Sequence, residues 1–206
     1  MRAPEYTVCV PHYAVPHGRR TLRVCLDTLM DNADAHYELL VYGNSEGGDL
    51  YQIYNDLAQR ASSEWLFLLM FDVYLPRHWD RAYLEARQPD LLLGCGVVEP
   101  GYEPVNPKCL RMDFGQAPET YRRASFEAWA MSAPAPTDWL WIFPWFVHRE
   151  NFLDLGGFDR YSRDDGSWNM TDLRFTEKWQ AAGGRVARAN TWVYHMSRWS
   201  ITGDKR

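Results

Sequence analysis

The chain has 206 residues, of which 46% are hydrophobic and 24% are charged, and its formal net charge is -5. This length suits one domain of three layers and is enough to bury a substantial core. The negative balance argues against a broad electrostatic grip on nucleic acid and leaves room only for a local basic groove. Aromatic residues make up 15% and ten are tryptophan, a side chain whose flat face stacks on sugars or bases.

The cysteines and the amino-terminal residues bear on the compartment. The four cysteines show no Cys-x-x-Cys spacing, which fits a reducing environment. The chain begins without a basic-then-apolar leader, and no apolar stretch approaches the roughly 20 residues that span a bilayer. We therefore expect a single domain over residues 1–206, located in the cytoplasm, with no transmembrane segment.

Strand and helix patterns alternate along the first half of the chain. The apolar, β-branched runs typical of buried strands are Tyr6 to Pro11, Glu38 to Tyr42, Glu64 to Pro76 and Asp90 to Val98. The segments with apolar residues at helical spacing are Arg20 to Met30, Leu50 to Ala61 and Trp79 to Arg87. This alternation predicts an α/β fold, a three-layer α/β/α sandwich around a mostly parallel central sheet.

The pattern weakens over residues 99–138, where prolines recur. We expect an irregular insertion there, or a lid over one side of a functional site, with one helix over Arg122 to Met131. Beyond it, helices are expected over Arg149 to Leu155 and Thr171 to Ala182, each followed by a pair of glycines. A last strand, Arg185 to Tyr194, leads directly to His195.

Asp72 is the anomaly of the longest apolar run, Glu64 to Pro76. An unpaired buried charge is very costly, so this carboxylate needs a divalent metal or a strong hydrogen-bond donor beside it. Ligands of open α/β sheets gather at the carboxyl ends of the strands, which is where Asp72 is expected. The alternative is that Asp72 only caps a turn or a following helix.

Several segments share one further property, their similarity to a known family, and they occur in that family's order. They are Val8 to Tyr13, Cys25 to Leu29, Glu38 to Ser45, Asn55, Leu69 to Pro76, Gly156 to Asp159 and Asp172 to Arg174. Together they resemble the nucleotide-sugar-dependent glycosyltransferases of the GT-A fold, most closely glycosyltransferase family 2. The resemblance implies transfer of one sugar from a nucleotide-diphosphate sugar to an acceptor.

The resemblance also implies a metal and a donor site. Mn²⁺ or Mg²⁺ would be held by Asp72 and His195 and would neutralise the charge that develops on the diphosphate. The alternative for His195 is a satisfied core or surface histidine. The residues expected to bind a UDP- or GDP-sugar are Pro11, His12, Tyr13, Asn44, Ser45, Asn55, Phe71, Asp72 and Arg198. Simple turn and cap chemistry is the alternative for Ser45 and Asn55.

On the acceptor side, the resemblance and the aromatic composition together indicate Trp145, Gly157, Trp168 and Trp199. Core packing is the alternative for Trp145 and Trp168, and an ordinary surface position is the alternative for Trp199 and the neighbouring Arg198. The acceptor is expected to be a glycan, a lipid-linked sugar or a modified base.

Two positions depart from the family pattern. Met70 takes the place of one carboxylate of the metal-binding Asp-x-Asp, and Met170 stands where inverting relatives carry the general base. Asp172 or Asp165 could supply the base that an inverting transfer needs, whereas a retaining transfer would dispense with it. A nucleotidyltransferase on a similar sheet and a degenerate module that binds a sugar nucleotide without turnover are the rival functions.

Overall fold

The computed structural model describes residues 2–13, 16–44, 49–101, 109–137, 144–160 and 171–196. Among these residues, none of the helices combines the length and the apolar character needed to cross a membrane.

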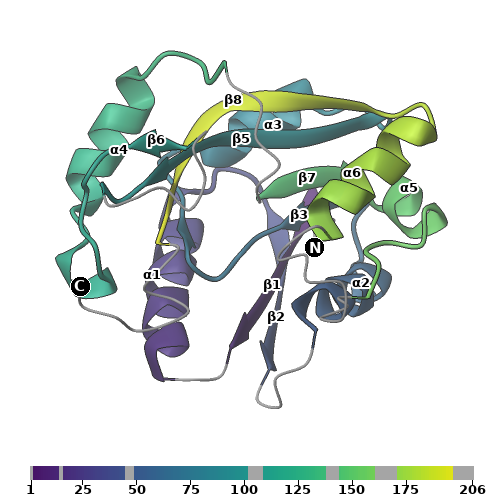
Figure 1. Ribbon diagram of the computed structural model, residues 1–206, viewed down its shortest axis with the longest axis horizontal. Coiled ribbons are helices and arrows are strands. Elements are labelled where there is room, and N and C mark those ends of the chain that lie inside the picture. Colours follow the sequence, from purple (N-terminus) through teal and green to yellow (C-terminus); the bar gives the residue numbers. More distant parts are fainter. Residues whose placement is uncertain are drawn as a thin grey trace.

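A curled, mostly parallel sheet forms the centre of the molecule (Figure 1). Its strands run in the order β2-β1-β3-β7-β5-β8-β4, and β6 pairs with β5 outside this path. Two strands, β7 and β4, run antiparallel to their neighbours. The strands are β1 (Tyr6–Tyr13), β2 (Tyr37–Asn44), β3 (Trp65–Leu68), β4 (Val73–Tyr74), β5 (Leu91–Glu99), β6 (Leu110–Arg111), β7 (Trp145–His148) and β8 (Arg185–His195).

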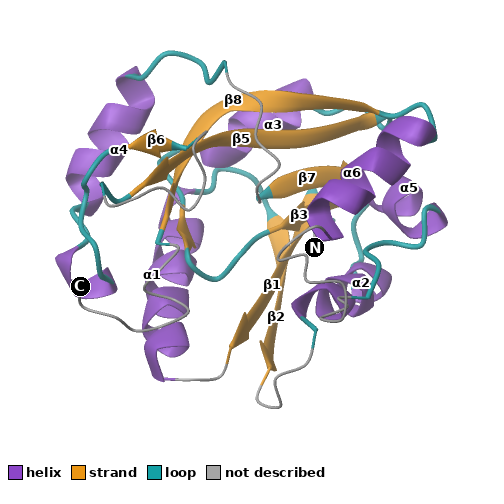
Figure 2. Ribbon diagram, in the orientation of Figure 1, coloured by secondary structure: helices purple, strands orange, loops and turns teal. Residues whose placement is uncertain are grey.

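Helices cover both faces of this sheet (Figure 2). They are α1 (Pro16–Asn32), α2 (Leu50–Arg60), α3 (Trp79–Ala86), α4 (Arg123–Ser132), α5 (Arg149–Asp154) and α6 (Thr171–Ala181), with a short 3-10 turn η1 (Pro118–Thr120). The first core cluster joins α1, α3 and α4 to one face, and the second joins α2, α5 and α6 to the other.

The sequence explains this layering, because successive strand residues point to opposite faces. In β3, Trp65 and Phe67 pack into the first cluster, whereas Leu66 and Leu68 pack into the second. A strand buried on both faces therefore reads as a continuous apolar run. The predicted three-layer α/β sandwich with a mostly parallel sheet is confirmed.

Most predicted elements occur with boundaries shifted by a few residues, including the helix expected within residues 99–138, which is α4. That segment is less irregular than expected, since it also contributes β6 and η1.

The prediction of one strand over Glu64 to Pro76 is wrong. β3 ends at Leu68, a turn closes with the Val73 amide donating to the Met70 carbonyl at 3.2 Å, and β4 then pairs with the end of β8. The chain thus leaves its place beside β1 and crosses to the far edge of the sheet. This break positions Asp72, because the turn carries it to the carboxyl end of β8.

Candidate functional site

The register of three adjacent strands brings two carboxylates to the end of β8. In the antiparallel pair β4 and β8, Val73 lies opposite His195. Asp72, which precedes Val73, therefore lies next to this pair, at the end of β8. The Met196 amide donates to the Asp72 carbonyl at 2.9 Å, which extends this pairing by one residue. In the parallel pair β5 and β8, Val98 lies opposite Tyr194, so Glu99 lies beside His195.

His195 is held between these two carboxylates. Its Nδ1 lies 2.9 Å from Glu99 Oε1, and its Nε2 lies 3.5 Å from Asp72 Oδ2. All three residues are buried, with 2% of Asp72, 4% of Glu99 and 7% of His195 exposed. The contact with Glu99 has the length of a good hydrogen bond, whereas the contact with Asp72 is too long for one and is mainly electrostatic. The two carboxylates therefore approach opposite nitrogens of one ring.

The charge state of this ring follows from its neighbours. Burial lowers the pKa of His195, but the combined attraction of Asp72 and Glu99 for a proton on the ring outweighs it and raises that pKa to about 10. Without a metal, the imidazole is therefore a cation at neutral pH.

The residues present fit a divalent cation held together with a substrate. His195 Nε2 is buried and has no hydrogen-bond partner among the residues that the structure describes. An imidazole nitrogen and a carboxylate oxygen facing one another are a donor pair that Mn²⁺ accepts. A cation would compete with the proton for Nε2, since a ligating imidazole must be neutral.

A complete protein cage is not present in the described part of the chain. No three His, Cys, Asp or Glu side chains there form a group that could hold an ion. Glu99 does not add to the pair, because it lies on the Nδ1 side of the ring. Waters and substrate phosphates commonly supply the remaining ligands at Mg²⁺ sites.

The residues predicted to bind the donor lie at the ends of neighbouring strands. β1 and β2 are parallel, and their register places His12 opposite Gly43 and Tyr13 opposite Asn44. The His12 ring lies against Gly43, where a Cβ would be 3.1 Å from Nε2. Pro11 and Asn44 are buried, and of Tyr13 only the backbone is described.

Phe71 belongs to the same turn as Asp72 and is only 2% exposed. Its ring belongs to the core cluster on the α1 face of the sheet. The turn is held from the other side, because the Tyr54 hydroxyl donates to the Leu69 carbonyl at 2.9 Å. Phe71 therefore fixes the position from which Asp72 reaches His195.

Asn55 and Gly157, predicted on the donor and acceptor sides, contact one another. Asn55 Nδ2 donates to the Phe158 carbonyl at 2.8 Å, and its Oδ1 accepts from the Phe158 amide at 2.8 Å. Gly157 has a positive φ of 62°, and a Cβ there would lie 2.3 Å from Asn55 Oδ1. Only glycine fits this turn, and the Asn55 amide is engaged in holding it.

Trp145, predicted on the acceptor side, is 2% exposed. Its ring packs 5.8 Å from each of the rings of Phe158 and Phe175. The structure thus places it in the core beneath the Gly156–Phe158 turn.

Asp172, the predicted base, lies in the first turn of helix α6 with its side chain half-buried. Its Oδ1 accepts from the Leu173 amide at 2.9 Å. Burial raises the pKa of Asp172 to about 6 and outweighs the backbone hydrogen bonds, which lower it. A carboxyl with this pKa is ionised at neutral pH and still has an appreciable proton affinity, as general bases require.

Five predicted site residues lie outside the described residues, namely Ser45, Asp165, Trp168, Arg198 and Trp199.

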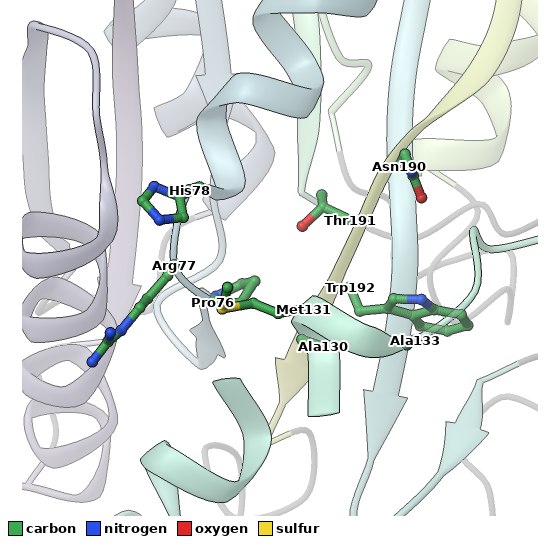
Figure 3. A pocket seen from close by; sticks show the side chains of 9 residues that line it. All are labelled: Pro76, Arg77, His78, Ala130, Met131, Ala133, Asn190, Thr191 and Trp192. Atoms are coloured by element: carbon green, nitrogen blue, oxygen red, sulfur yellow. The ribbon is translucent and has the colours of Figure 1, made fainter. Parts of the chain in front are cut away.

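A cavity of about 140 Å³ lies near the site but does not include it. Figure 3 shows its lining side chains coming from the segment after β4, from α4 and from β8. Of the β8 residues in its wall, Thr191 precedes His195 by four positions, which is about 13 Å along a strand. Neither Asp72 nor His195 lines this cavity.

Glu99 is the residue of the site that the sequence interpretation missed. It was assigned to the start of the insertion, although it ends a buried apolar strand just as Asp72 follows one. An acidic residue at the end of such a run was the available signal.

Comparisons with known proteins extend the description of the fold. No protein-family model matches the chain, and no curated protein matches it. Among solved structures, it is similar to the catalytic domain of Drosophila beta1,4-galactosyltransferase 7 in complex with xylobiose, with 15% identity and a TM-score of 0.58 over 99% of this chain and 74% of that one. It is also similar to a mutant of that enzyme in complex with manganese, UDP-Gal and xylobiose, with 12% identity and a TM-score of 0.60 over 95% of this chain and 72% of that one.

These similarities show the fold alone. The chain has the GT-A glycosyltransferase fold, as the sequence resemblance implied.

Proposed function

We propose that this protein is a metal-assisted glycosyltransferase that moves a single sugar from a nucleotide-diphosphate sugar to an acceptor hydroxyl, with inversion at the anomeric carbon. The observation that carries the proposal is the approach of Asp72 and His195 at one edge of a GT-A sheet, 3.5 Å apart and buried. The proposed acceptor is a glycan, a lipid-linked sugar or a modified base.

The donor end of the reaction follows from this pair. Mn²⁺ or Mg²⁺, when bound, neutralises the negative charge that grows on the departing diphosphate. Asp72 and His195 would hold that ion, and the β4–β8 ladder keeps both side chains in place. UDP-sugars are the first donors to consider, because one structural neighbour was crystallised with manganese and UDP-Gal.

The nucleotide itself would lie across the ends of β1 and β2. Pro11, His12, Tyr13 and Asn44 are located there, beside the turn that carries Phe71 and Asp72. The carboxyl ends of parallel strands are where α/β sheets bind nucleotides. Ser45, Asn55 and Arg198 are the other members of the predicted donor set.

The acceptor end of the reaction needs a base. The Asp172 carboxylate would take the proton of the acceptor hydroxyl while the new bond to the anomeric carbon forms and the bond to the phosphate oxygen breaks. Asp165 is the alternative base. Gly157, Trp168 and Trp199 are proposed on the acceptor side, and a structural neighbour was crystallised in complex with xylobiose.

The experiment that tests the proposal incubates the protein with UDP-, GDP- and dTDP-sugars, Mn²⁺ and a panel of sugar acceptors, and measures nucleotide release. We expect release with at least one donor, and we expect Asp72→Asn to lower it about 10²- to 10³-fold. Asp154→Asn is the matched control, because Asp154 is an exposed aspartate at the end of α5. Pyrophosphate release from a nucleoside triphosphate would instead identify a nucleotidyltransferase.

A second candidate is a module that binds a sugar nucleotide without turnover. The observation in its favour is the single carboxylate of the Asp-x-Asp position, together with the lack of a three-residue metal group in the described part of the chain. Stabilisation of the protein by a nucleotide sugar in thermal unfolding, without nucleotide release in any acceptor mixture, would favour this candidate.

A further inference from the structure

Glu99 is the third member of the buried cluster around His195, and the proposed reaction gives it no role so far. Its carboxylate Oε1 lies 2.9 Å from His195 Nδ1, and its side chain is almost fully buried. A carboxylate in this position accepts a hydrogen bond from the Nδ1 proton. Nε2, the other ring nitrogen, is then the one that faces Asp72.

We infer that Glu99 is a positioning residue that orients the His195 imidazole toward a divalent cation by accepting a hydrogen bond from its Nδ1–H group. The inference rests on the proposed metal-assisted function. Metal-ligating histidines usually donate their second ring N–H to such a partner, which fixes the ring orientation and raises the basicity of the ligating nitrogen.

The backbone around Glu99 is fixed on both sides. β5 pairs in parallel with β8 up to Val98 and Tyr194, which sets Glu99 beside His195. On the other side β6 pairs with β5, and the Met112 amide donates to the Glu99 carbonyl at 3.1 Å. Glu99 is therefore held by a strand on each side.

The groups near the Glu99 side chain leave its charge available to the imidazole. Cys109 is a buried neighbour whose thiol pKa is raised by its burial and by the Glu99 carboxylate, so this thiol is neutral. No ion pair between Glu99 and an arginine or lysine occurs among the described residues. His195 is thus the cationic partner of Glu99 in this part of the molecule.

The geometry separates two tasks that a single carboxylate could not combine. Asp72 approaches Nε2 and can share an ion with it, whereas Glu99 approaches Nδ1 and cannot. Removal of Glu99 leaves both candidate ligands in the protein but frees the ring to rotate. A loss of metal affinity without a loss of either ligand is therefore the signature of this role.

The test titrates wild type and variants with Mn²⁺, alone and with UDP, and measures free Mn²⁺ by electron paramagnetic resonance. Glu99→Ala is expected to weaken Mn²⁺ binding about 10- to 100-fold. Glu99→Gln, which keeps an acceptor oxygen but loses the charge, is expected to weaken it about three- to tenfold. Electron spin-echo modulation from an imidazole nitrogen should persist in Glu99→Gln and disappear in His195→Ala.

Glu127→Ala is the matched control. Glu127 is also a buried carboxylate, but it bonds to Asn32 and Arg123 on the helical layer. The Glu127→Ala substitution should lower the unfolding temperature and leave the affinity for Mn²⁺ unchanged.

The possible outcomes distinguish a failure of the Glu99 inference from a failure of the proposed metal-assisted function. Wild type that binds no Mn²⁺ would overturn the metal-assisted function and this inference with it. Wild type that binds Mn²⁺ with an affinity equal to that of Glu99→Ala would overturn the inference alone. If Glu99→Ala does not fold, Glu99→Gln decides, and wild-type affinity in that variant would overturn the inference.

Discussion

Two regions of this protein are each organised around a buried aspartate, and they use it differently. Asp80, which is 1% exposed, lies in the first turn of α3 and accepts hydrogen bonds from the amides of Asp34 and Ala35 and from the Tyr6 hydroxyl. Asp72, which is 2% exposed, lies in the turn before β4 and faces the His195 ring.

Burial of a carboxylate therefore does not by itself identify a functional site. The groups that contact the carboxylate do distinguish a structural role from a functional one. The donors around Asp80 are neutral groups of the fold, and their hydrogen bonds tie α3 to the segment after α1. The group facing Asp72 is a titratable imidazole at the end of the opposite strand. A structural carboxylate and a candidate ligand thus lie in the same stretch of sequence.

The largest expected effect is on stability, at Asp80. Asp80→Ala leaves the Asp34 amide, the Ala35 amide and the Tyr6 hydroxyl without their acceptor, and each lost partner costs about 1–3 kcal/mol. We expect a loss of about 3–5 kcal/mol in the free energy of unfolding, measured by urea titration. Asp154→Ala serves as the exposed control. A loss in Asp80→Ala no larger than in that control would contradict the structural role.

At Asp72 the larger effect should be on the reaction. Asp72→Asn is expected to lower Mn²⁺-dependent nucleotide release about 10²- to 10³-fold, because one ligand of the ion loses its charge. Stability should fall by only about 1–2 kcal/mol, since His195 keeps Glu99 as a partner. Initial rates and urea unfolding of the same preparation measure both effects. If Asp72→Asn lost as much stability as Asp80→Ala and kept its rate of nucleotide release, Asp72 would be a structural carboxylate like Asp80 and not a metal ligand.

Asn55 is expected to behave like Asp80. Asn55→Ala removes the two hydrogen bonds to the Phe158 backbone and should cost about 1–3 kcal/mol of unfolding free energy. The KM for the donor should stay unchanged in the folded variant. A raised KM with unchanged stability would show instead that the amide contacts the nucleotide.

The smallest effect concerns Asp172, a third partly buried aspartate. Because its pKa is raised from 3.8 to about 6, the active carboxylate is lost as pH falls through about 6, and the rate should be about a tenth of its maximum one unit below. The stability slope has the opposite sign, since a raised acid pKa means that stability falls as pH rises from 3.8 through 6. Reaction rates and the free energy of unfolding, measured between pH 3.8 and 6, test both pH dependences. Asp172→Asn should remove the part of each that comes from this carboxyl. An unchanged rate profile in that variant would exclude Asp172 as the base.

Much of the fold could be predicted from the sequence, because its central strands are buried on both faces and two of its helices, α5 and α6, are followed by glycines. The runs that became β1 and β5 are nearly continuous in apolar residues. The positive φ values of Gly156, Gly157 and Gly183 explain why helices end where glycines occur. Such local signals do not depend on distant parts of the chain.

The rest depended on contacts between distant segments. The break between Leu68 and Val73 is not visible in an unbroken apolar run, since it arises because β8 offers a partner to β4. Glu99 likewise could not be assigned to the site from the sequence, because only the register of β5 and β8 places it beside His195. The family resemblance implies the pairing of Asp72 with His195, whose Oδ2 and Nε2 atoms lie 3.5 Å apart.

The most direct measurement is an anomalous difference map of crystals grown with Mn²⁺ and UDP. If the metal-assisted function is right, we expect one manganese peak within bonding distance of an Asp72 carboxylate oxygen, of His195 Nε2 and of oxygens of the diphosphate. A diphosphate bound at this edge of the sheet with no manganese beside it, and with the imidazole still between Asp72 and Glu99, would contradict the account.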